Sequence, residues 1–318
     1  MTRLFSLLSV ALVAVSASAI ALQHRQDDNN GIRLAVSPKC GRLGGNFTDV
    51  NAGIDMSTIK TIVSFGDSYT DGGIRNGSKL RPPVISPPNP LAGGRGTNGP
   101  VWIENIANDM GANFMDYAVS GGVVNVSLWP SAAGKVDFIQ QAATFLNQSN
   151  KLDPATTLYT VFFGINDFGH TKTDGNHLPE AAADLLKQIS LLASPPTNAR
   201  SFLVADIYGR GNHAARGEAW KQQIFAGLGT MHTEAPSLNV AYADFSTIWD
   251  AVRGTSPGFA AFGYTSSGSC LATGVTTTEQ ACADPEHTFY WLSGHPSKET
   301  HRIMADYVKE VLATCAAP

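Results

Sequence analysis

The stretch TIVSFGDSYTD, residues 61–71, joins an apolar run to a polar turn and decides how the chain folds. Residues 61–65 include β-branched and aromatic side chains, which favour a buried strand. Gly66, Asp67 and Ser68 follow at once, and small or polar residues of this kind end a strand. We therefore predict a buried strand that is followed directly by an exposed serine hydroxyl at the N-terminus of a helix.

The same alternation of apolar runs and turns recurs along the chain. Further buried-strand patterns occupy residues 114–118, 157–163, 201–207 and 239–245. Helical patterns lie between the strands at residues 101–110, 136–146, 180–193 and 213–232, and one more amphipathic helix follows Pro296. Strands that alternate with helices predict an α/β fold, with a mainly parallel five-stranded sheet covered on both faces.

Length and composition predict one large globular domain. The chain has 318 residues, of which 43% are hydrophobic and 15% charged, and this is enough to bury a sizeable core. Its formal net charge of -4 argues against nucleic acid or an anionic membrane as a partner. We expect a monomer whose domain spans residues 56–318, preceded by a polar, loosely packed leader at residues 20–55.

The first residues have the anatomy of a secretory signal. Arg3 precedes an apolar run, and small residues end the segment at Ala19, so we expect residues 1–19 to be a signal peptide of a secreted, extracellular protein. The apolar run is too short to span a bilayer, so we expect no transmembrane anchor. Four N-x-S/T sequons supply candidate glycosylation sites, at Asn46, Asn76, Asn125 and Asn147.

The four cysteines fit disulfide bonds in an oxidising compartment. Cys270 and Cys282 bracket one Gly/Thr-rich loop, and we expect them to pair. Cys40 and Cys315 would then tie the N-terminal segment to the last helix. Four cysteines permit three connectivities, so this pairing is one of three. The absence of CxxC spacing in the sequence disfavours a metal site.

Polar or small residues follow the strands at the edge where such a sheet binds ligands. Ser68 follows the first strand, Gly121 and Gly122 follow the second, and Asn166 follows the third. His295 stands in the segment WLSGHPS, just before the last helix. Each residue alone has an ordinary explanation as a turn, cap or packing residue. Together they supply a nucleophile, a base and oxyanion donors, which is what acyl transfer needs.

The order and wording of these segments resemble the GDSL or SGNH hydrolase family. VSFGDSYTD is similar to the nucleophile block of that family, DYAVSGG to its glycine block, VFFGINDFG to its GxND block and HPS to its histidine block. The resemblance covers about residues 60–312. Within the family, the secreted fungal-type carbohydrate acetylesterases (carbohydrate esterase family 16) look most similar. The resemblance implies a three-layer, flavodoxin-like α/β/α sandwich that needs no metal and no cofactor.

The resemblance also implies a role for each residue. Ser68 would be the nucleophile, and His295 the general base that later protonates the leaving alcohol. The backbone N–H groups of Ser68 and Gly121 and the side-chain amide of Asn166 would form the oxyanion hole. The implied activity is hydrolysis of short-chain carboxylic esters, above all O-acetyl groups on plant-derived saccharides. The alternatives are a lipase or phospholipase that acts on longer acyl esters, and a non-catalytic glycan-binding relative.

One residue departs from the family pattern. Most members carry an aspartate three residues before the histidine, and this chain has Leu292 there. Three explanations are open. A main-chain carbonyl of Leu292 or a neighbour accepts the Nδ1 proton of His295, an acid from elsewhere (Asp284 or Glu286) replaces the aspartate, or the site has lost its activity.

Overall fold

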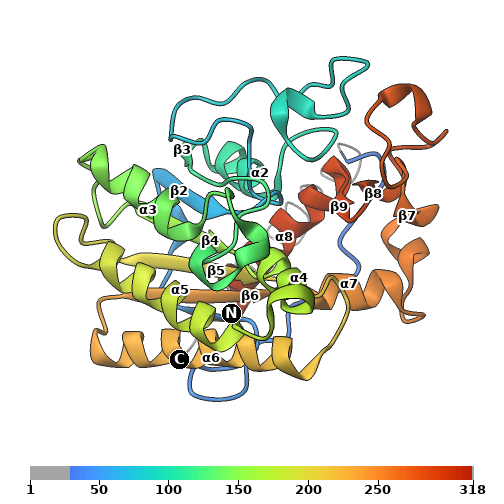
Figure 1. The fold of residues 1–318 in the computed structure, drawn as a ribbon. Helices are drawn as coiled ribbons and strands as arrows, with labels where there is room; N and C mark the ends of the chain where they lie inside the picture. The colour runs from blue at the N-terminus through green and yellow to red at the C-terminus, as the bar shows by residue number, and fades with distance from the viewer. Residues whose placement is uncertain (1–28, 317–318) are drawn as a thin grey trace, which may run out of the picture.

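The structure, a computed structural model, describes residues 29–316. The expected signal peptide at residues 1–19 and the first part of the expected leader, residues 20–28, lie outside the described residues. The centre of the fold is a six-stranded sheet in the order β1–β6–β5–β4–β2–β3 (Figure 1). Its strands are β1 (Val50–Ala52), β2 (Thr61–Gly66), β3 (Asn113–Asp116), β4 (Thr157–Phe162), β5 (Ser201–Asp206) and β6 (Asn239–Asp244).

The strands from β2 to β6 are parallel to one another. Counted along the chain, these strands stand in the order 2-1-3-4-5, which is that of flavodoxin-like doubly wound folds. The predicted α/β fold with a mainly parallel sheet is confirmed. The strand order reverses between β2 and β4, and the crevice beyond the carboxyl ends at such a point is where ligands bind.

The sixth strand corrects the expectation of a loosely packed leader at its last part, residues 50–52, which belong to the sheet. β1 pairs antiparallel with β6, and Val50 is fully buried. The neighbouring Asp49 accepts hydrogen bonds from the hydroxyl of Tyr307 and from the N–H of Asp244. An edge strand of this length forms because it hydrogen-bonds to the strand beside it. The polar, Gly/Asn-rich sequence around β1 therefore did not predict a strand.

Helices cover both faces of the sheet (Figure 1). On one face lie α2 (Trp102–Met110), α7 (Ser246–Arg253) and α8 (Lys298–Thr314). On the other lie α3 (Phe138–Asn147), α5 (Leu178–Ala193) and α6 (Ala215–Glu234). Alternate side chains of β2 serve the two cores, since Ile62 packs in the first and Val63 and Phe65 in the second.

Several elements were not predicted from the sequence. They are α7, the short helix α4 (Ile165–Asp174) directly after β4, and a second sheet of β7 (Ser266–Ser269), β8 (Thr288–Leu292) and β9 (His295–Pro296). Short 3₁₀ helices occupy Met56–Thr58, Ala92–Gly94, Val126–Leu128, Pro130–Ala132, Phe259–Phe262 and Thr278–Gln280. β8 and β9 form an antiparallel hairpin in which Leu292 pairs with His295. This hairpin places the histidine directly after a two-residue turn.

The disulfides join Cys40 to Cys315 and Cys270 to Cys282. This is the pairing expected from the sequence. The first bond holds the segment before β1 against the end of α8, where the chain also forms an isolated parallel β-bridge between Asn51 and Ala316. The N-terminal segment is thus tied to the core by a covalent bond as well as by the sheet.

The exposure of the sequon asparagines bears on the expected glycosylation. Of the sequon asparagines, Asn46, Asn76 and Asn147 are exposed. Asn125 is half-buried, and its amide donates a hydrogen bond to Asp184 at 2.7 Å, so it is the least accessible of the four. Within residues 29–316, no helix has the length and apolar character needed to cross a bilayer.

We expect the double variant Cys40→Ser/Cys315→Ser to unfold more readily. The disulfide bridges a sequence separation of 275 residues, and closing a long loop restricts the unfolded chain most. Its free energy of unfolding, measured by chemical denaturation, should fall by about 3–5 kcal/mol. Cys270→Ser/Cys282→Ser opens a separation of only 12 residues and should lose less. Equal losses in the two variants would contradict the loop-length explanation.

Candidate active site

Ser68 and His295 meet beyond the carboxyl ends of the parallel strands. Ser68 lies on the turn after β2, and its Oγ is 2.8 Å from Nε2 of His295 at the start of β9. The sequence predicted a helix N-terminus at Ser68, and this is wrong. The N–H groups of Thr70 and Asp71 both donate to the carbonyl of Asp67, which closes a turn that does not continue as a helix.

Buried side chains fix the backbone on either side of Ser68. Gln141 of α3 accepts a hydrogen bond from the N–H of Gly66 at 3.0 Å and donates to the carbonyl of Gly66 at 2.9 Å. Asp67 is fully buried and accepts from the N–H of Tyr69 at 3.0 Å. Burial raises the pKa of Asp67 to about 7. The serine therefore stands between two anchored peptide groups.

Gly121 and Asn166 complete the set that the sequence singled out. A cavity of about 410 Å³ is lined by both of them together with Ser68 and His295. Gly121 has a φ of 80°, a left-handed conformation that favours glycine. The N–H groups of Ser68 and Gly121 donate to no acceptor in the described part of the chain. Two backbone donors are thus free to bind an oxyanion near Ser68.

Asn166 lies in the first turn of α4, which begins directly after β4. Gly164 makes this sharp entry with a φ of 124°. The side-chain amide of Asn166 donates to the carbonyl of Gly122 at 2.9 Å and to Asp67 at 3.3 Å. These bonds hold the amide between the serine turn and the glycine loop, where it borders the cavity.

The second nitrogen of His295 faces a main-chain carbonyl. Nδ1 lies 3.2 Å from the carbonyl oxygen of Ser293, the neighbour of Leu292. This is the first of the three explanations for the missing aspartate. When Nδ1 carries the proton and donates it to this carbonyl, Nε2 presents its lone pair to Ser68.

The two acids considered as substitutes are engaged elsewhere. Asp284 accepts a hydrogen bond from His287 at 2.7 Å, and Glu286 lies 3.8 Å from the ammonium of Lys298. Neither forms a hydrogen bond or ion pair with His295 in the described part of the chain. The explanation through a carboxylate from this loop is therefore wrong.

Two donors converge on the turn that precedes His295. The hydroxyl of Tyr69 and Nη1 of Arg210 both donate to the carbonyl of Gly294, at 2.7 and 3.0 Å. Gly294 has a φ of 70°, and a Cβ at this position would collide with the guanidinium of Arg210. The positive φ thus favours glycine here, and the clamped turn keeps the carbonyl of Ser293 in place.

Arg210 is a site residue that was not predicted from the sequence. It lies in the loop after β5 with a φ of 49°, and its own carbonyl accepts a hydrogen bond from Arg253. The prediction drew its strand-end residues from the first three strands alone. The fourth parallel strand leads into the segment YGRGN and ends at the same edge of the sheet, so the same rule would have found Arg210.

Burial keeps the imidazole of His295 neutral. Burial lowers the pKa of His295 below its ordinary 6.5, the hydrogen bond to the carbonyl of Ser293 raises it, and the positive charge of Arg210 lowers it further. A neutral imidazole at hydrogen-bond distance from a serine can accept its proton. With the free N–H donors beside it, this arrangement can support nucleophilic attack on a carbonyl group.

Comparison with known proteins finds one matching family and two relatives. The profile of the GDSL-like Lipase/Acylhydrolase family matches residues 62–308. The thermolabile hemolysin of Vibrio parahaemolyticus is 25% identical over 283 residues, with 82% of this chain and 65% of that protein covered. The phosphatidylcholine-sterol acyltransferase of Aeromonas hydrophila is 27% identical over 157 residues, with 47% and 46% covered. The chain thus spans less than two thirds of either relative.

A solved structure gives a weaker match. A catalytic mutant of an acetylxylan esterase from Geobacillus stearothermophilus aligns with a TM-score of 0.43 and 16% identity. The alignment covers 81% of this chain and 97% of that one. The sheet order and the family profile therefore carry the assignment of the fold.

We expect the imidazole of His295 to titrate below pH 6.5, because burial disfavours the charged form. Its neutral form then persists to lower pH than in an exposed histidine. In Arg210→Gln the pKa of His295 should rise, since a positive charge that opposes protonation is lost. In Arg210→Lys the positive charge remains, so the pKa of His295 should rise less. NMR titration of the imidazole protons measures both. An equal rise in Arg200→Gln, an exposed position, would contradict this account.

Proposed function

Because the chain belongs to the family of GDSL-like lipases and acylhydrolases, we propose that it is a carboxylic ester hydrolase with Ser68 as its nucleophile. We further propose that it removes short acyl groups, above all O-acetyl groups, from plant-derived saccharides outside the cell. The contact of 2.8 Å between Ser68 Oγ and the neutral His295 carries this proposal. The two disulfides fit an oxidising compartment, which supports secretion.

The proposed reaction has two steps. Ser68 Oγ attacks the ester carbonyl carbon while its proton passes to Nε2 of His295. The N–H groups of Ser68 and Gly121 donate to the tetrahedral oxygen, and the amide of Asn166 joins them by giving up its longer hydrogen bond, the one to Asp67 at 3.3 Å. The bond to the alcohol then breaks, and the proton on His295 moves to the leaving oxygen. Water, activated by His295, releases the acid from the acyl-enzyme in the reverse order.

The carbonyl of Ser293 takes over one part of the task of the usual aspartate. It accepts the Nδ1 proton, so it fixes the tautomer and the ring orientation of His295. It carries no net charge, so it stabilises the imidazolium less than a carboxylate would. The proposed site therefore depends more on orientation and on its oxyanion donors.

The cavities beside Ser68 favour a small acyl group and a polar alcohol. One measures about 270 Å³ and the other about 410 Å³. Among the described residues that line them, the aliphatic side chains are Ile165 in the first and Leu91 and Leu292 in the second. A long acyl chain would need a more continuous apolar wall to gain from burial. An acetyl group needs none.

One observation favours a second candidate. The name of a curated relative, phosphatidylcholine-sterol acyltransferase, states a lipid substrate, which supports a lipase or phospholipase acting on longer acyl esters. A series of 4-nitrophenyl esters separates the two functions. The acetylesterase should show a higher kcat/KM on acetate than on octanoate, and the reverse order would establish the lipase. Saccharide binding without turnover of any ester would point to the non-catalytic relative.

Ser68→Ala should lose turnover of 4-nitrophenyl acetate by about 10⁴-fold or more, because no other group replaces the nucleophile. The pre-steady-state burst of 4-nitrophenol that reports the acyl-enzyme should also vanish. Ser190→Ala, at an exposed position on α5, is the matched control and should keep both. Unchanged turnover in Ser68→Ala would overturn the proposed function.

Asn166→Ala should lower kcat for the same ester by about 10²–10³-fold, because one oxyanion donor is removed. Steady-state kinetics should show the loss mainly in kcat, since the oxyanion forms only in the transition state. Asn176→Ala, at an exposed position just after α4, serves as the control. A loss confined to KM would show that Asn166 binds the substrate and does not stabilise the oxyanion.

A further inference from the structure

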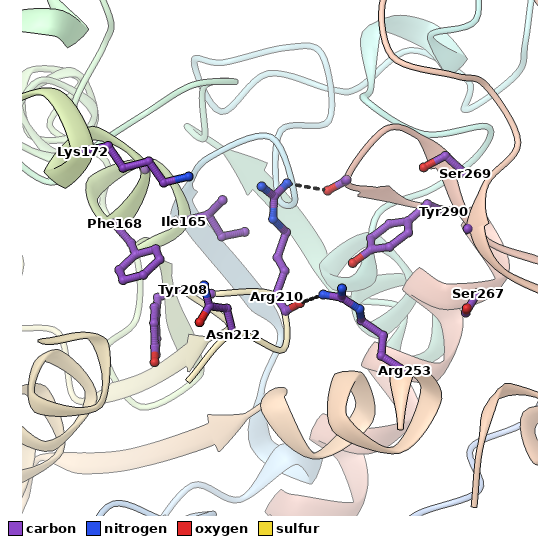
Figure 2. Close-up of a pocket in the computed structure, with 14 residues that line it drawn as sticks. Ile165, Phe168, Lys172, Tyr208, Arg210, Asn212, Arg253, Ser267, Ser269 and Tyr290 are labelled. Atoms are coloured by element: carbon purple, nitrogen blue, oxygen red, sulfur yellow. Dashed lines mark hydrogen bonds between the residues drawn. The ribbon is translucent and has the colours of Figure 1, made fainter. Parts of the chain in front are cut away.

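A larger cavity adjoins the one beside Ser68 (Figure 2). It measures about 480 Å³, against about 270 Å³ for its neighbour. The two share Ile165, Gly169 and Arg210 in their walls. The part of a substrate that extends from Ser68 past Arg210 would therefore enter the larger cavity. In the proposed reaction, this part is the alcohol.

Three basic side chains from separate segments line the larger cavity. Lys172 comes from α4, Arg210 from the loop after β5, and Arg253 from the last residue of α7. Figure 2 shows the three side chains grouped around the same space. The described residues that line the cavity include no aspartate or glutamate. A concave surface with charges of one sign concentrates ligands of the opposite sign.

Two carboxylates on the helices α6 and α7 form hydrogen bonds away from the cavity. Asp250 on α7 lies 2.8 Å from Nε2 of His213, and Glu218 on α6 lies 3.1 Å from Nδ1 of the same ring. Glu218 also accepts a hydrogen bond from the hydroxyl of Tyr208. The pKa of His213 is raised, chiefly by its hydrogen bond to Asp250. The two acids are thus occupied by a histidine outside the cavity.

In the described part of the chain, the hydrogen bonds of the two guanidinium groups go to main-chain carbonyls and to the hydroxyl of Tyr69, and none goes to a carboxylate. Arg210 donates to the carbonyl of Gly294, and Arg253 donates to the carbonyl of Arg210. Lys172 is exposed and forms no ion pair with a described residue. Each guanidinium has five N–H donors, so both retain donors for a ligand. The cavity therefore holds three positive charges that form no ion pair with a described carboxylate. Buried Asp67 interacts with Arg210 through its charge, but it does not line the cavity.

The rest of the wall suits a saccharide better than a lipid. Tyr208 and Tyr290 contribute aromatic rings with hydroxyl groups, and Asn212, Ser267 and Ser269 contribute short polar side chains. Amphipathic tyrosines and well-placed polar groups bind ligands that carry many hydroxyls. An acyl chain or a sterol would find few aliphatic side chains there.

We propose that this cavity binds a carboxylate on the alcohol part of the ester, so that the substrates are acetylated saccharides that contain a uronic acid. This inference rests on the proposed function and adds a substrate class to it. The carboxylate accepts charge-assisted hydrogen bonds from Arg210 and Arg253, and Lys172 adds a third positive charge. The acetyl group then lies beside Ser68, and the sugar ring extends along the tyrosines.

The test compares two acetylated oligosaccharides that differ only in one uronic acid unit. The protein should hydrolyse the acidic one with a kcat/KM about tenfold higher than the neutral one. This ratio should fall towards one in Lys172→Gln/Arg253→Gln and should shrink as salt is raised. Lys187→Gln/Arg200→Gln removes the same charge from exposed positions elsewhere and should keep the ratio. Thermal melting confirms that each variant is folded.

The outcomes distinguish the two proposals. If no ester is hydrolysed, 4-nitrophenyl acetate included, the proposed function fails. If neutral esters are hydrolysed but the ratio is near one, or if the ratio survives in Lys172→Gln/Arg253→Gln, the inference alone fails. A third substrate, acetylated glycerol phosphate, covers the other source of an anion. A preference for it over the acidic saccharide would assign the cavity to a phosphate group and overturn the proposal.

Discussion

The carbonyl oxygen of Gly294 accepts hydrogen bonds from Tyr69 and Arg210, and the geometry beside the serine depends on this pair. Tyr69 follows Ser68 in the chain, so its hydrogen bond ties the serine turn directly to the histidine turn. Arg210 ties the same carbonyl to the loop after β5. Three strand-end segments are thereby held together at one atom. In a site without a carboxylate behind the histidine, this rigidity keeps a neutral carbonyl in the right place for Nδ1.

Arg210 belongs to two parts of the site at once. Its guanidinium holds the turn before His295, and the same residue lines both the cavity beside Ser68 and the larger basic cavity. The positive charge also lowers the pKa of His295, together with burial, which acts more strongly. A residue in this position connects the environment of the proposed base with the proposed binding site of the alcohol. A change in the charge of Arg210 would therefore affect both the pKa of His295 and the proposed binding of the alcohol.

Much of the fold could be predicted because buried parallel strands leave a clear local pattern. β2, β4, β5 and β6 lie within a residue of their predicted limits, since apolar runs bounded by turns suffice to place them. β1 and the hairpin around His295 were not predicted. β1 pairs with the distant strand β6, and β9 has only 2 residues. Strands as short as these carry little periodicity of their own.

The sequence by itself determined the parallel sheet and the four residues that meet beyond the ends of its strands. It also indicated the disulfide partners, as one of three possible pairings. Strand-end motifs of this kind are local, so Ser68, Gly121, Asn166 and His295 could be read from their neighbours. Only the tertiary structure decided what orients His295, because the acceptor is a backbone atom and no side chain at position 292 encodes it. It also decided the role of Arg210, whose partner lies 84 residues away. Contacts between distant segments depend on how the loops pack, and local sequence patterns do not record this.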